Sequence, residues 1–460
     1  MSGRARKREI DEASGLSEST SAALLPVQPV VSKKLKVENQ ISTSATSALR
    51  HGHIYYTKVH SALDCFNENC FSLADLLASI RPTSSLHFNF MIDLDWVLRQ
   101  YPAELRTTPI SLVVGEKMGT SKTDIERTSK ALGSTNVEVF TAKLPIPYGT
   151  HHTKLSLFES ADRRLHIVVS TANLVEGDWR EKTQAFYYCT GELQSTASTS
   201  HTVFQTELLD YLARYKLPSV DAWIEKLKST TLVENGDHFI YSVPGYHKAD
   251  DQEKIAQLAL RKALKTRKPD PGALYIAQCS SIGSLGSKPD QWMLSQFLIT
   301  LRGGRSTGST RLFLVYPTVK NVQESYEGWS AGGSLPYQSG THQKQPWLRT
   351  ALCKWFSENR GRSQAMPHVK TYCEIGEDRE LKWMVLTSAN LSKAAWGEIQ
   401  KGGQQLCVRS YEAGVLIQDK SRCELPYDYP ICRYKLEDEP WTVDTTQLEA
   451  DSHGRQWIMD

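Results

Sequence analysis

Two histidines and two lysines occur in a short pattern that the chain carries twice. The first copy is His152-Thr153-Lys154, and the second is His368-Val369-Lys370. An apolar run follows each copy, and then an Ala-Asn-Leu sequence that contains Asn173 in the first copy and Asn390 in the second. The lysine-to-asparagine spacing is nearly equal in both copies, and a tryptophan follows each asparagine by six residues. A single histidine of this kind is usually packed or solvated, but the matched context indicates a duplicated catalytic half-site.

Two imidazoles, two ammonium groups and two amides together suit a phosphodiester substrate. The ammonium and amide groups can bind the non-bridging oxygens and stabilise charge in a five-coordinate transition state. One imidazole attacks phosphorus, and the other protonates the leaving oxygen and then activates water. Positioned general acid catalysis contributes about 10²–10⁴-fold, so phosphate binding and covalent catalysis must supply the rest. The lysines carry the charge stabilisation, so we expect neither a metal nor a cofactor.

The elements around the motifs must bring both copies to one place. Residues i and i+2 of an extended segment point to the same side, so the histidine and lysine of each copy should project together. The apolar runs at 165–169 and 383–386 are predicted to be buried neighbouring strands. Asn173 and Asn390 then lie just beyond strand ends, where α/β sheets usually place their sites. If the two halves pack about a pseudo-twofold axis, all six side chains meet.

Strand and helix patterns alternate along the chain, which predicts an α/β fold. A polar stretch near 232–245 is predicted to be a domain junction. We therefore predict an N-terminal domain at 61–238 and a C-terminal domain at 239–460, each with one motif. Strands are expected at 86–91, 110–114, 137–140, 273–278 and 312–316, and helices at 72–80, 124–132, 252–264 and 290–301.

The beginning of the chain has a different composition. Residues 1–54 contain no Phe, Trp or Tyr and are rich in Ser, Thr and Ala. Such a segment cannot bury enough apolar surface to offset its ordering entropy, so we predict a disordered tail over residues 1–60. Basic clusters at 4–8 and 33–36 favour nuclear import, and the alternative is an ordinary solvated tail.

The gross composition excludes several classes of protein. The 460 residues are 40% hydrophobic and 23% charged, as in soluble globular proteins, and the net charge of +3 is too small to indicate nucleic-acid binding by itself. The nine cysteines form no CxxC pairs, which favours reduced thiols over zinc binding. No apolar run is long enough to span a membrane, so we expect no membrane partner.

The two motifs resemble those of the phospholipase D superfamily, whose His-x-Lys repeats form one shared active site. Members of that superfamily usually have an Asp five positions after the lysine, but this chain has Glu159 and Ile375 there. A downstream Asn in place of this Asp is the variant found in tyrosyl-DNA phosphodiesterases. Further blocks resemble that family, and together they cover the chain from about residue 60 onward; they are residues 88–96, 148–154, 281–286, 331–337 and 387–396.

The resemblance implies two phospholipase D-like α/β/α sandwich halves related by a pseudo-twofold axis. It implies a metal-independent DNA repair enzyme that hydrolyses the bond between a DNA 3′-phosphate and a topoisomerase I tyrosine, among other 3′ adducts. The partners would be single-stranded, nicked or blunt DNA ends, and the chain would act as a monomer in the nucleus. His152 would form a phosphohistidine, and His368 would protonate the tyrosine and later deprotonate water. The phosphate would be held by Lys154, Lys370, Asn173 and Asn390.

The resemblance also implies supporting and substrate-binding residues. Gln184 and Glu412 match positions that orient the histidines, although polar residues on strand surfaces would look the same. Tyr148 matches an aromatic position that stacks on a DNA base, a contact worth about 1–3 kcal/mol, and simple packing is the alternative. The remaining implied substrate contacts, for which a plain turn or a core position would also serve, are Ser281, Ser284, Ser388 and Trp457.

Two other functions stay open at this point. One is a broader phospholipase D-type nuclease or phospholipase, which the missing Asp and the lack of an amphipathic membrane-binding stretch disfavour. The other is an inactive scaffold that binds DNA ends, and its binding would be unchanged by His152→Ala. If His152 is the nucleophile, the adjacent His151 is the one residue that could replace it.

Overall fold

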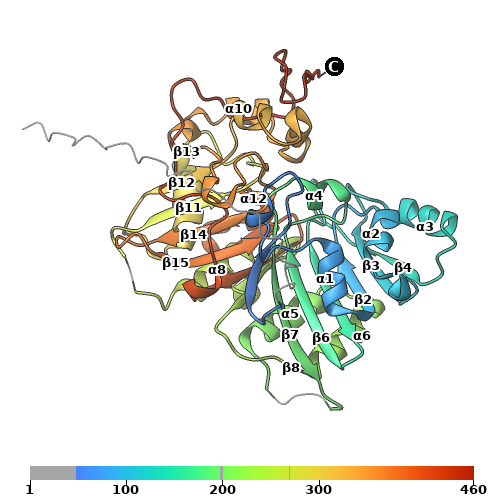
Figure 1. The fold of residues 1–460 in the computed structure, drawn as a ribbon. Helices are drawn as coiled ribbons and strands as arrows, with labels where there is room; N and C mark the ends of the chain where they lie inside the picture. The colour runs from blue at the N-terminus through green and yellow to red at the C-terminus, as the bar shows by residue number, and fades with distance from the viewer. Residues whose placement is uncertain (1–47, 197–199, 269, 460) are drawn as a thin grey trace, which may run out of the picture. The chain divides into compact units, whose positions relative to one another are not determined.

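Two β-sheets form the framework of the protein. The structure is a computed structural model that describes residues 48–196, 200–268 and 270–459, which belong to one compact unit. Within these residues the first sheet has eight strands and lies toward the lower right of Figure 1, and the second has seven and lies to the left. The first sheet contains β1 (His53–Tyr56), β2 (Pro82–Phe88), β3 (Ile110–Gly115), β4 (Val137–Ala142), β5 (Leu155–Ser160), β6 (Arg164–Ser170), β7 (Ala185–Leu193) and β8 (Thr230–Thr231). The second contains β9 (His238–Ser242), β11 (Leu274–Gln278), β12 (Leu312–Val315), β13 (Leu352–Cys353), β14 (Thr371–Ile375), β15 (Leu381–Thr387) and β18 (Glu412–Ile417).

The two sheets have the same strand order. The first runs β1-β7-β6-β5-β2-β3-β4, and the second, read from its other edge, runs β9-β18-β15-β14-β11-β12-β13. In both, the first four pairings are antiparallel and the last two are parallel. Each His-x-Lys motif ends where matching strands begin, because β5 follows Lys154 and β14 follows Lys370. The duplication seen in the motifs therefore extends to the fold.

Capping residues fix where several helices begin. Ser72 accepts a hydrogen bond from the Asp75 backbone, and the Asp75 carboxylate accepts one from Ser72 in return, which forms a capping box. The predicted start of this helix and its buried apolar face are confirmed. The α-helices are α1 (Leu73–Ile80), α2 (Leu94–Gln100), α3 (Lys122–Ala131), α4 (Glu176–Arg180), α5 (Val203–Ala213), α6 (Pro218–Lys228), α7 (Ala249–Gln252), α8 (Ala256–Leu264), α9 (Leu298–Leu301), α10 (Val319–Gln323), α11 (Ser339–Gln343) and α12 (Lys393–Trp396). Short 3-10 segments are η1 (Asp64–Phe66), η2 (Ala103–Leu105), η3 (Pro289–Gln291), η5 (Gly328–Ser334), η6 (Pro346–Ala351), η7 (Glu358–Arg360), η8 (Lys401–Gly403) and η9 (Lys420–Arg422), and η4 (Met293–Phe297) is a π-helix.

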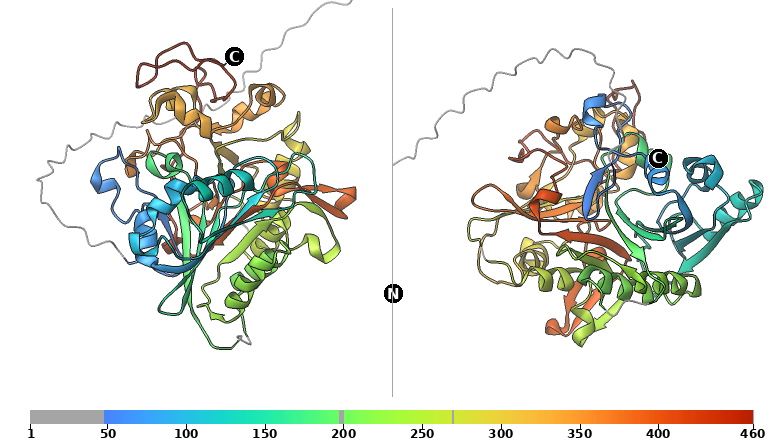
Figure 2. Two further views of the ribbon diagram at one scale, coloured as in Figure 1. Left: turned by 90° about the vertical axis from the view of Figure 1, so that its right-hand side faces the viewer. Right: turned by 60° about the horizontal axis from the view of Figure 1, so that its bottom comes forward.

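Helices cover both faces of the first sheet. Side chains alternate along a strand, so Leu165, Ile167 and Val169 of β6 join a buried cluster with α5 and α6. Val168 points the other way and joins a second cluster with α1, α2 and α3. This half is therefore an α/β/α sandwich, which confirms the predicted α/β fold. Figure 2 shows α5 and α6 in green along one side of the sheet.

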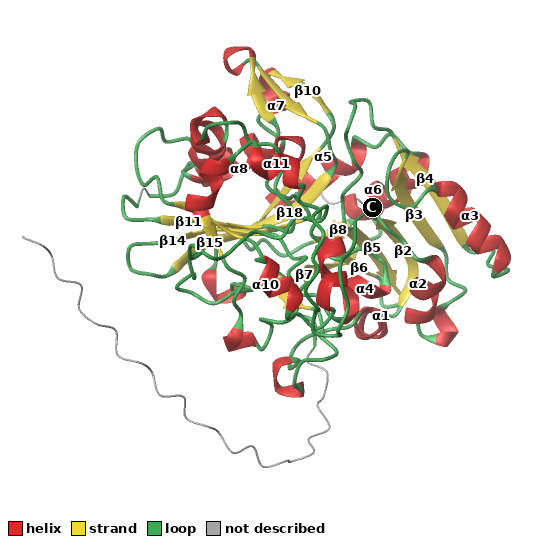
Figure 3. Cartoon of the chain, turned by 90° about the horizontal axis from the view of Figure 1, so that it is seen from above, coloured by secondary structure: helices red, strands yellow, loops and turns green. Residues whose placement is uncertain are grey.

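The core continues into the second half. The cluster that contains α5 and α6 also includes buried residues of β9, β11, β15 and β18. Both α5 and α8 contact β9, the first strand of the second sheet. A small third sheet consists of β10 (Gly245–Lys248), β17 (Gln405–Val408) and β16 (Glu398–Gln400), and it lies with α7 at the upper edge of Figure 3. Shared packing therefore holds the two halves in a fixed relation.

The structure corrects the predicted start of the ordered chain. Residues 53–56 form β1, which pairs antiparallel with β7, so a disordered tail cannot extend to residue 60. Ile54, Tyr55 and Tyr56 pack their side chains in the core clusters, a long-range contact that local composition does not predict. The basic clusters at 4–8 and 33–36 lie outside the described residues. The boundary at 238/239 stays a prediction, and the chain passes from the first sheet to the second between β8 and β9.

Two predicted helices are less regular than expected. The segment 290–301 contains the end of η3, the π-helix η4 and α9. Trp292, between η3 and η4, is fully buried, and its indole donates to the Gly397 carbonyl at 3.0 Å. In the segment 252–264 the helix α8 begins only at Ala256, which has a positive φ of 48°, and Gln252 is the last residue of α7. In the part of the chain that the structure describes, no helix is long and apolar enough to cross a membrane.

Candidate active site

The two His-x-Lys motifs are docked by reciprocal contacts between the halves. His151 forms a β-bridge with Tyr411, and Pro367 forms one with Thr183. The backbone N–H of His152 donates to the Tyr411 carbonyl, and that of His368 donates to the Thr183 carbonyl, both at 3.0 Å. Each motif therefore lies beside the residue that precedes Gln184 or Glu412 of the other half. A pseudo-twofold axis would produce contacts of this kind.

His152 is held by a carboxylate from the second half. Its Nδ1 lies 2.9 Å from Oε2 of Glu412, the first residue of β18. Burial lowers the pKa of His152, while the Glu412 carboxylate opposes this effect. The ring is therefore neutral at pH 7, with its proton on Nδ1 facing Glu412. Nε2 is left as an unprotonated nitrogen on a fixed ring.

Ser388 supports this contact and does not face a substrate. Its side chain is fully buried, and its hydroxyl donates to Glu412 at 2.6 Å. The same oxygen accepts a hydrogen bond from the Ala413 backbone. The predicted substrate contact of Ser388 is therefore corrected, because its side chain is fully buried and its one hydroxyl hydrogen is donated to Glu412.

His368 is held by two groups from the first half. Its Nδ1 lies 2.8 Å from Nε2 of Gln184 and 3.1 Å from Oδ2 of Asp178. The Gln184 amide oxygen accepts a hydrogen bond from Thr171 at 2.7 Å. Burial lowers the pKa of His368, and the Asp178 carboxylate opposes this effect. Gln184 and Glu412 thus contact the histidines in a crossed arrangement, with each half supporting the ring of the other.

Asp178 is a site residue that the sequence analysis missed. It lies on the short helix α4 and is buried, and its Oδ2 also accepts a hydrogen bond from the backbone N–H of Asn173 at 2.7 Å. Burial alone would raise the pKa of Asp178, but His368 and Lys182 lower it by more. The net pKa is below the usual value, so this carboxyl is ionised at neutral pH. Its position directly before the repeated tryptophan was the available signal.

The two lysines lie buried at the centre of the site. Nζ of Lys154 donates to the His152 carbonyl at 2.8 Å, and Nζ of Lys370 donates to the His368 carbonyl. Burial lowers the pKa of Lys154 to about 8, and burial together with the charge of Lys154 lowers the pKa of Lys370 well below its usual value. Two buried lysines whose charged forms are disfavoured in the free site form a site for an anion.

The two asparagines are positioned differently. The amide oxygen of Asn390 accepts from the backbone N–H groups of Ser280 and Ser281, both at 3.0 Å, so its amide nitrogen remains as a donor. The backbone carbonyl of Asn173 accepts from the indole of Trp179 at 2.8 Å. The first repeated tryptophan therefore holds its motif in place. Trp396, its counterpart, is fully buried.

The predicted substrate contacts lie at different depths. Tyr148 is 89% exposed and has a φ of 61°, a left-handed conformation that is strained for a non-glycine residue and that concentrates at functional sites. Ser281 is half-buried beside Asn390, and Ser284 is exposed in the same loop. Trp457 is partly buried and packs edge-on against Trp441, with its indole donating to the Val443 carbonyl at 3.0 Å.

Phe90 also lines the site, although the sequence analysis gave it no function. The centroid of the Phe90 ring lies 5.5 Å from the centroid of the His152 ring and 5.6 Å from Nζ of Lys154. An aromatic face near an ammonium group stabilises its charge. Across residues 48–196, 200–268 and 270–459, no group of three or more His, Cys, Asp or Glu side chains is placed to hold a metal ion.

The fold and the site together define a member of the phospholipase D superfamily, with one His-x-Lys motif from each of two like halves. A family model described as tyrosyl-DNA phosphodiesterase matches residues 53–450. A probable tyrosyl-DNA phosphodiesterase of Caenorhabditis elegans is 39% identical over 467 residues, which cover 98% of this chain and 99% of that protein. The chain belongs to the tyrosyl-DNA phosphodiesterase family.

Further similarities agree with this family. Tyrosyl-DNA phosphodiesterase 1 of Drosophila melanogaster is 33% identical over 401 residues, which cover 79% of this chain and 68% of that protein. The crystal structure of the yeast tyrosyl-DNA phosphodiesterase superposes with a TM-score of 0.68 at 22% identity. The match covers 85% of this chain and 100% of the yeast chain. At this identity, the structural similarity supports the fold.

Proposed function

We propose that this chain hydrolyses the bond between a DNA 3′-phosphate and the tyrosine of a trapped topoisomerase I, and leaves a 3′-phosphate. The observation that carries the proposal is the pair of buried lysines between two histidines whose Nδ1 atoms are engaged by the opposite half. The lysines favour an anion, and the engaged Nδ1 atoms leave both Nε2 atoms for the reaction. A phosphodiester is an anion that needs both a nucleophile and a general acid.

In the first step, Nε2 of His152 attacks phosphorus. The bond between phosphorus and the tyrosine oxygen breaks, and His368 gives its Nε2 proton to that oxygen. Glu412 stabilises the positive charge that develops on His152 as the new bond forms. Lys154 and Lys370, with Asn173 and Asn390, hold the non-bridging oxygens and offset the charge of the transition state. The product is a phosphohistidine joined to the DNA 3′ end.

In the second step, water replaces His152 on phosphorus. The neutral His368 takes a proton from the attacking water, and the bond between phosphorus and Nε2 of His152 breaks. The negative charges of the bound phosphate and of Asp178 offset the effect of burial and favour the imidazolium of His368, which is the form in which it starts and ends the cycle. His152 ends as the neutral ring. Both histidines therefore return to their starting states with a free 3′-phosphate as product.

Chemistry and family membership both favour a tyrosyl leaving group. The phenol of tyrosine has a pKa of about 10, which makes it a better leaving group than a sugar hydroxyl. The related proteins are named for tyrosyl-DNA, so we take single-stranded, nicked or blunt DNA ends that carry a tyrosyl peptide as the substrate class. We therefore propose that the chain acts as a monomer in nuclear DNA repair.

The function is tested with a single-stranded oligonucleotide that bears a 3′-phosphotyrosine. We expect the purified chain to convert it to a 3′-phosphate end in excess EDTA. Failure to convert an oligonucleotide that still binds would instead support a DNA-end scaffold. Failure both to bind and to convert it, with activity on phosphatidylcholine, would support a phospholipase.

Substrate affinity should fall as the pH rises above about 8. A bound phosphodiester raises the pKa of Lys154 above its value of about 8 in the free site. Binding strength is therefore full below that value and is lost as pH rises through it, by up to about tenfold per pH unit for each proton taken up. The lowered pKa of Lys370 adds to this trend. Fluorescence anisotropy with a labelled 3′-phosphotyrosine oligonucleotide and the His152→Ala chain measures the effect.

The control for this pH dependence is a charge change away from the site. Lys143→Met removes an exposed lysine and should keep the pH dependence, whereas Lys154→Met should flatten it. An affinity that is constant from about pH 7 to about pH 10 in the chain with both lysines would contradict an anion site at Lys154.

Tyr148→Ala should raise KM with little change in kcat. The exposed ring of Tyr148 is proposed to stack on a DNA base, and loss of such a contact costs about 1–3 kcal/mol, or roughly 5–150-fold in affinity. Steady-state kinetics on the phosphotyrosine oligonucleotide measures the change. Tyr148→Phe is the matched control and should behave like the unmodified chain. A lower kcat at unchanged KM would show that Tyr148 does not act through binding.

A further inference from the structure

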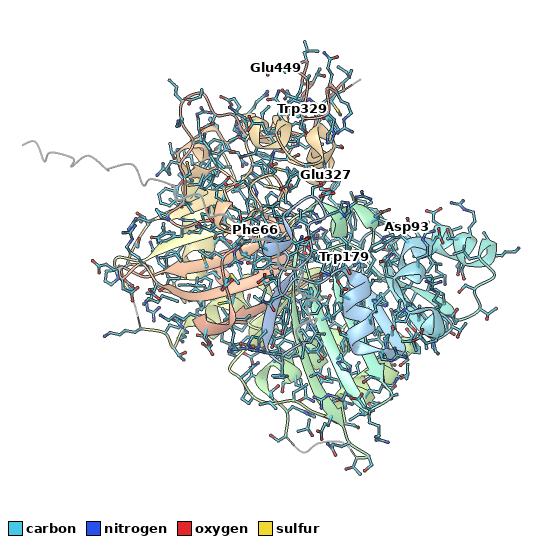
Figure 4. All side chains as sticks on the ribbon, viewed as in Figure 1. Phe66, Asp93, Trp179, Glu327, Trp329 and Glu449 are labelled. Carbon is cyan, nitrogen blue, oxygen red and sulfur yellow. The ribbon has the colours of Figure 1, made fainter. Side chains whose placement is uncertain are left out.

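Asp178 is a second carboxylate at the centre of the site, and the repeated motif does not include it. Its Oδ2 lies 3.1 Å from Nδ1 of His368 and accepts the backbone N–H of Asn173 at 2.7 Å. The side chain is only 5% exposed. Figure 4 labels the next residue, Trp179, near the middle of the molecule, and Glu327 just above it in the same view.

The two halves differ at this position. Asp178 follows Asn173 by five residues, and the residue at the same distance from Asn390 is Ala395. Glu412 begins β18, and its counterpart ahead of the matching strand β7 is the neutral Gln184. Each histidine therefore has one carboxylate from the opposite half, but the two carboxylates come from positions that are not equivalent.

The proposed reaction requires a particular tautomer of His368. Nε2 must give a proton to the leaving tyrosine and later take one from water, so the proton on Nδ1 must stay in place throughout. A proton on Nδ1 needs an acceptor, and Oδ2 of Asp178 is one. Nε2 of Gln184 lies 2.8 Å from Nδ1 and is a donor, so a proton on Nδ1 requires the Gln184 amide to turn its oxygen toward the ring and its Nε2 toward the Thr171 hydroxyl.

Asp178 also stabilises the protonated form of His368 against the charges of the nearby lysines. Lys370 and Lys154 disfavour the imidazolium, and the Asp178 carboxylate favours it. The charge of Lys182 also acts on Asp178. However, Nζ of Lys182 lies 2.8 Å from Oε1 of Glu327 and forms an ion pair with that carboxylate. Asp178 is thus the anion that offsets the two lysines at His368, and the neutral Gln184 cannot do so.

We propose that Asp178 is a positioning residue that keeps a proton on Nδ1 of His368, so that Nε2 serves as the acid in the first step and as the base in the second. The inference rests on the proposed function, because it explains how His368 can act as an acid and then as a base in that reaction. The protons balance: Nε2 loses one to the tyrosine oxygen and regains one from water, while the Nδ1 proton stays facing Asp178.

The test separates proton transfer from folding by changing the leaving group. Two oligonucleotides are compared in single turnovers, one with a 3′-phosphotyrosine and one with a 3′-(4-nitrophenyl) phosphate. Nitrophenolate is a weak base and leaves without a proton, so its release measures the attack of His152 alone. In a second measurement with this substrate in excess over the protein, the size of the initial burst of nitrophenolate counts the folded, active sites in each preparation.

The variants are Asp178→Asn and Glu176→Gln. The asparagine keeps an acceptor for the Asn173 backbone but removes the charge at His368. Glu176 lies on the same helix, is 61% exposed and pairs with Arg180, so its variant removes an equal charge without contact to His368. We expect Asp178→Asn to slow tyrosine release by about 100-fold, to keep nitrophenol release within about threefold, and to accumulate the DNA–His152 adduct. Glu176→Gln should match the unmodified chain in all three.

Two outcomes would overturn the role of Asp178. Equal losses of tyrosine and nitrophenol release would show a structural role, and unchanged tyrosine release would show no role in the reaction. The unmodified chain tests the proposed function separately in the same experiment. If it releases neither leaving group, the proposed function fails, whereas an active unmodified chain with an equally active Asp178→Asn variant overturns only the role of Asp178.

Discussion

Replacing His152 with alanine should reduce hydrolysis of a 3′-phosphotyrosine oligonucleotide by at least about 10⁴-fold, the scale on which removal of a nucleophile acts. The structure shows why the neighbouring histidine cannot compensate. His151 is fully buried, and its Nε2 lies 2.9 Å from the Tyr215 hydroxyl. Its ring packs edge-on against Tyr215 and Tyr411 in the core. Single-turnover rates of tyrosine release measure the loss.

The matched control is His151→Gln, which changes the adjacent imidazole. Because His151 faces the core, this variant should lose stability before it loses catalysis, and its folded fraction should still form the covalent adduct. Tyrosine release by His152→Ala within about tenfold of the unmodified chain would contradict the nucleophilic role.

Replacing His368 with asparagine should trap the reaction between its two steps. The asparagine cannot take a proton from water, so hydrolysis of the phosphohistidine should slow by about 10²–10⁴-fold. The first step also slows, since the tyrosine loses its general acid, but it continues because His152 and both lysines remain. A species with DNA joined to protein should therefore accumulate on a denaturing gel.

The control for this adduct is the double variant His152→Ala, His368→Asn, which should give none. An adduct in the double variant would place the covalent bond on another residue. The absence of any adduct in the single variant, together with measurable product, would contradict a two-step reaction.

Much of the site could be predicted from the sequence because the motif is repeated. Local spacing was enough to pair each histidine with its lysine and to place Asn173 and Asn390 beyond strand ends. The family resemblance gave Gln184 and Glu412 as residues that orient the histidines, but not the crossed contacts of Gln184 with His368 and of Glu412 with His152. Sequence spacing alone could not provide them, because each contact joins residues of opposite halves.

The features that were missed depend on packing between distant segments. Asp178 approaches His368 only because the two halves dock, and its position before the repeated tryptophan marks it as part of the motif without indicating this contact. Ser388 was taken for a substrate contact because a serine in a motif looks available, but its hydroxyl is used by Glu412. β1 was placed in the predicted tail, although Ile54, Tyr55 and Tyr56 favour a strand, and its pairing with the distant strand β7 orders it.

The central claim is that DNA becomes attached to Nε2 of His152 in a site shared by both halves. Its most direct test is to locate the adduct that the His368→Asn variant accumulates. The adduct is digested at neutral to alkaline pH, where a phosphohistidine survives, and the modified peptide is fragmented in a mass spectrometer. We predict a nucleotide on His152 and none on His151. A nucleotide on His151, on a lysine or on any serine would contradict the account.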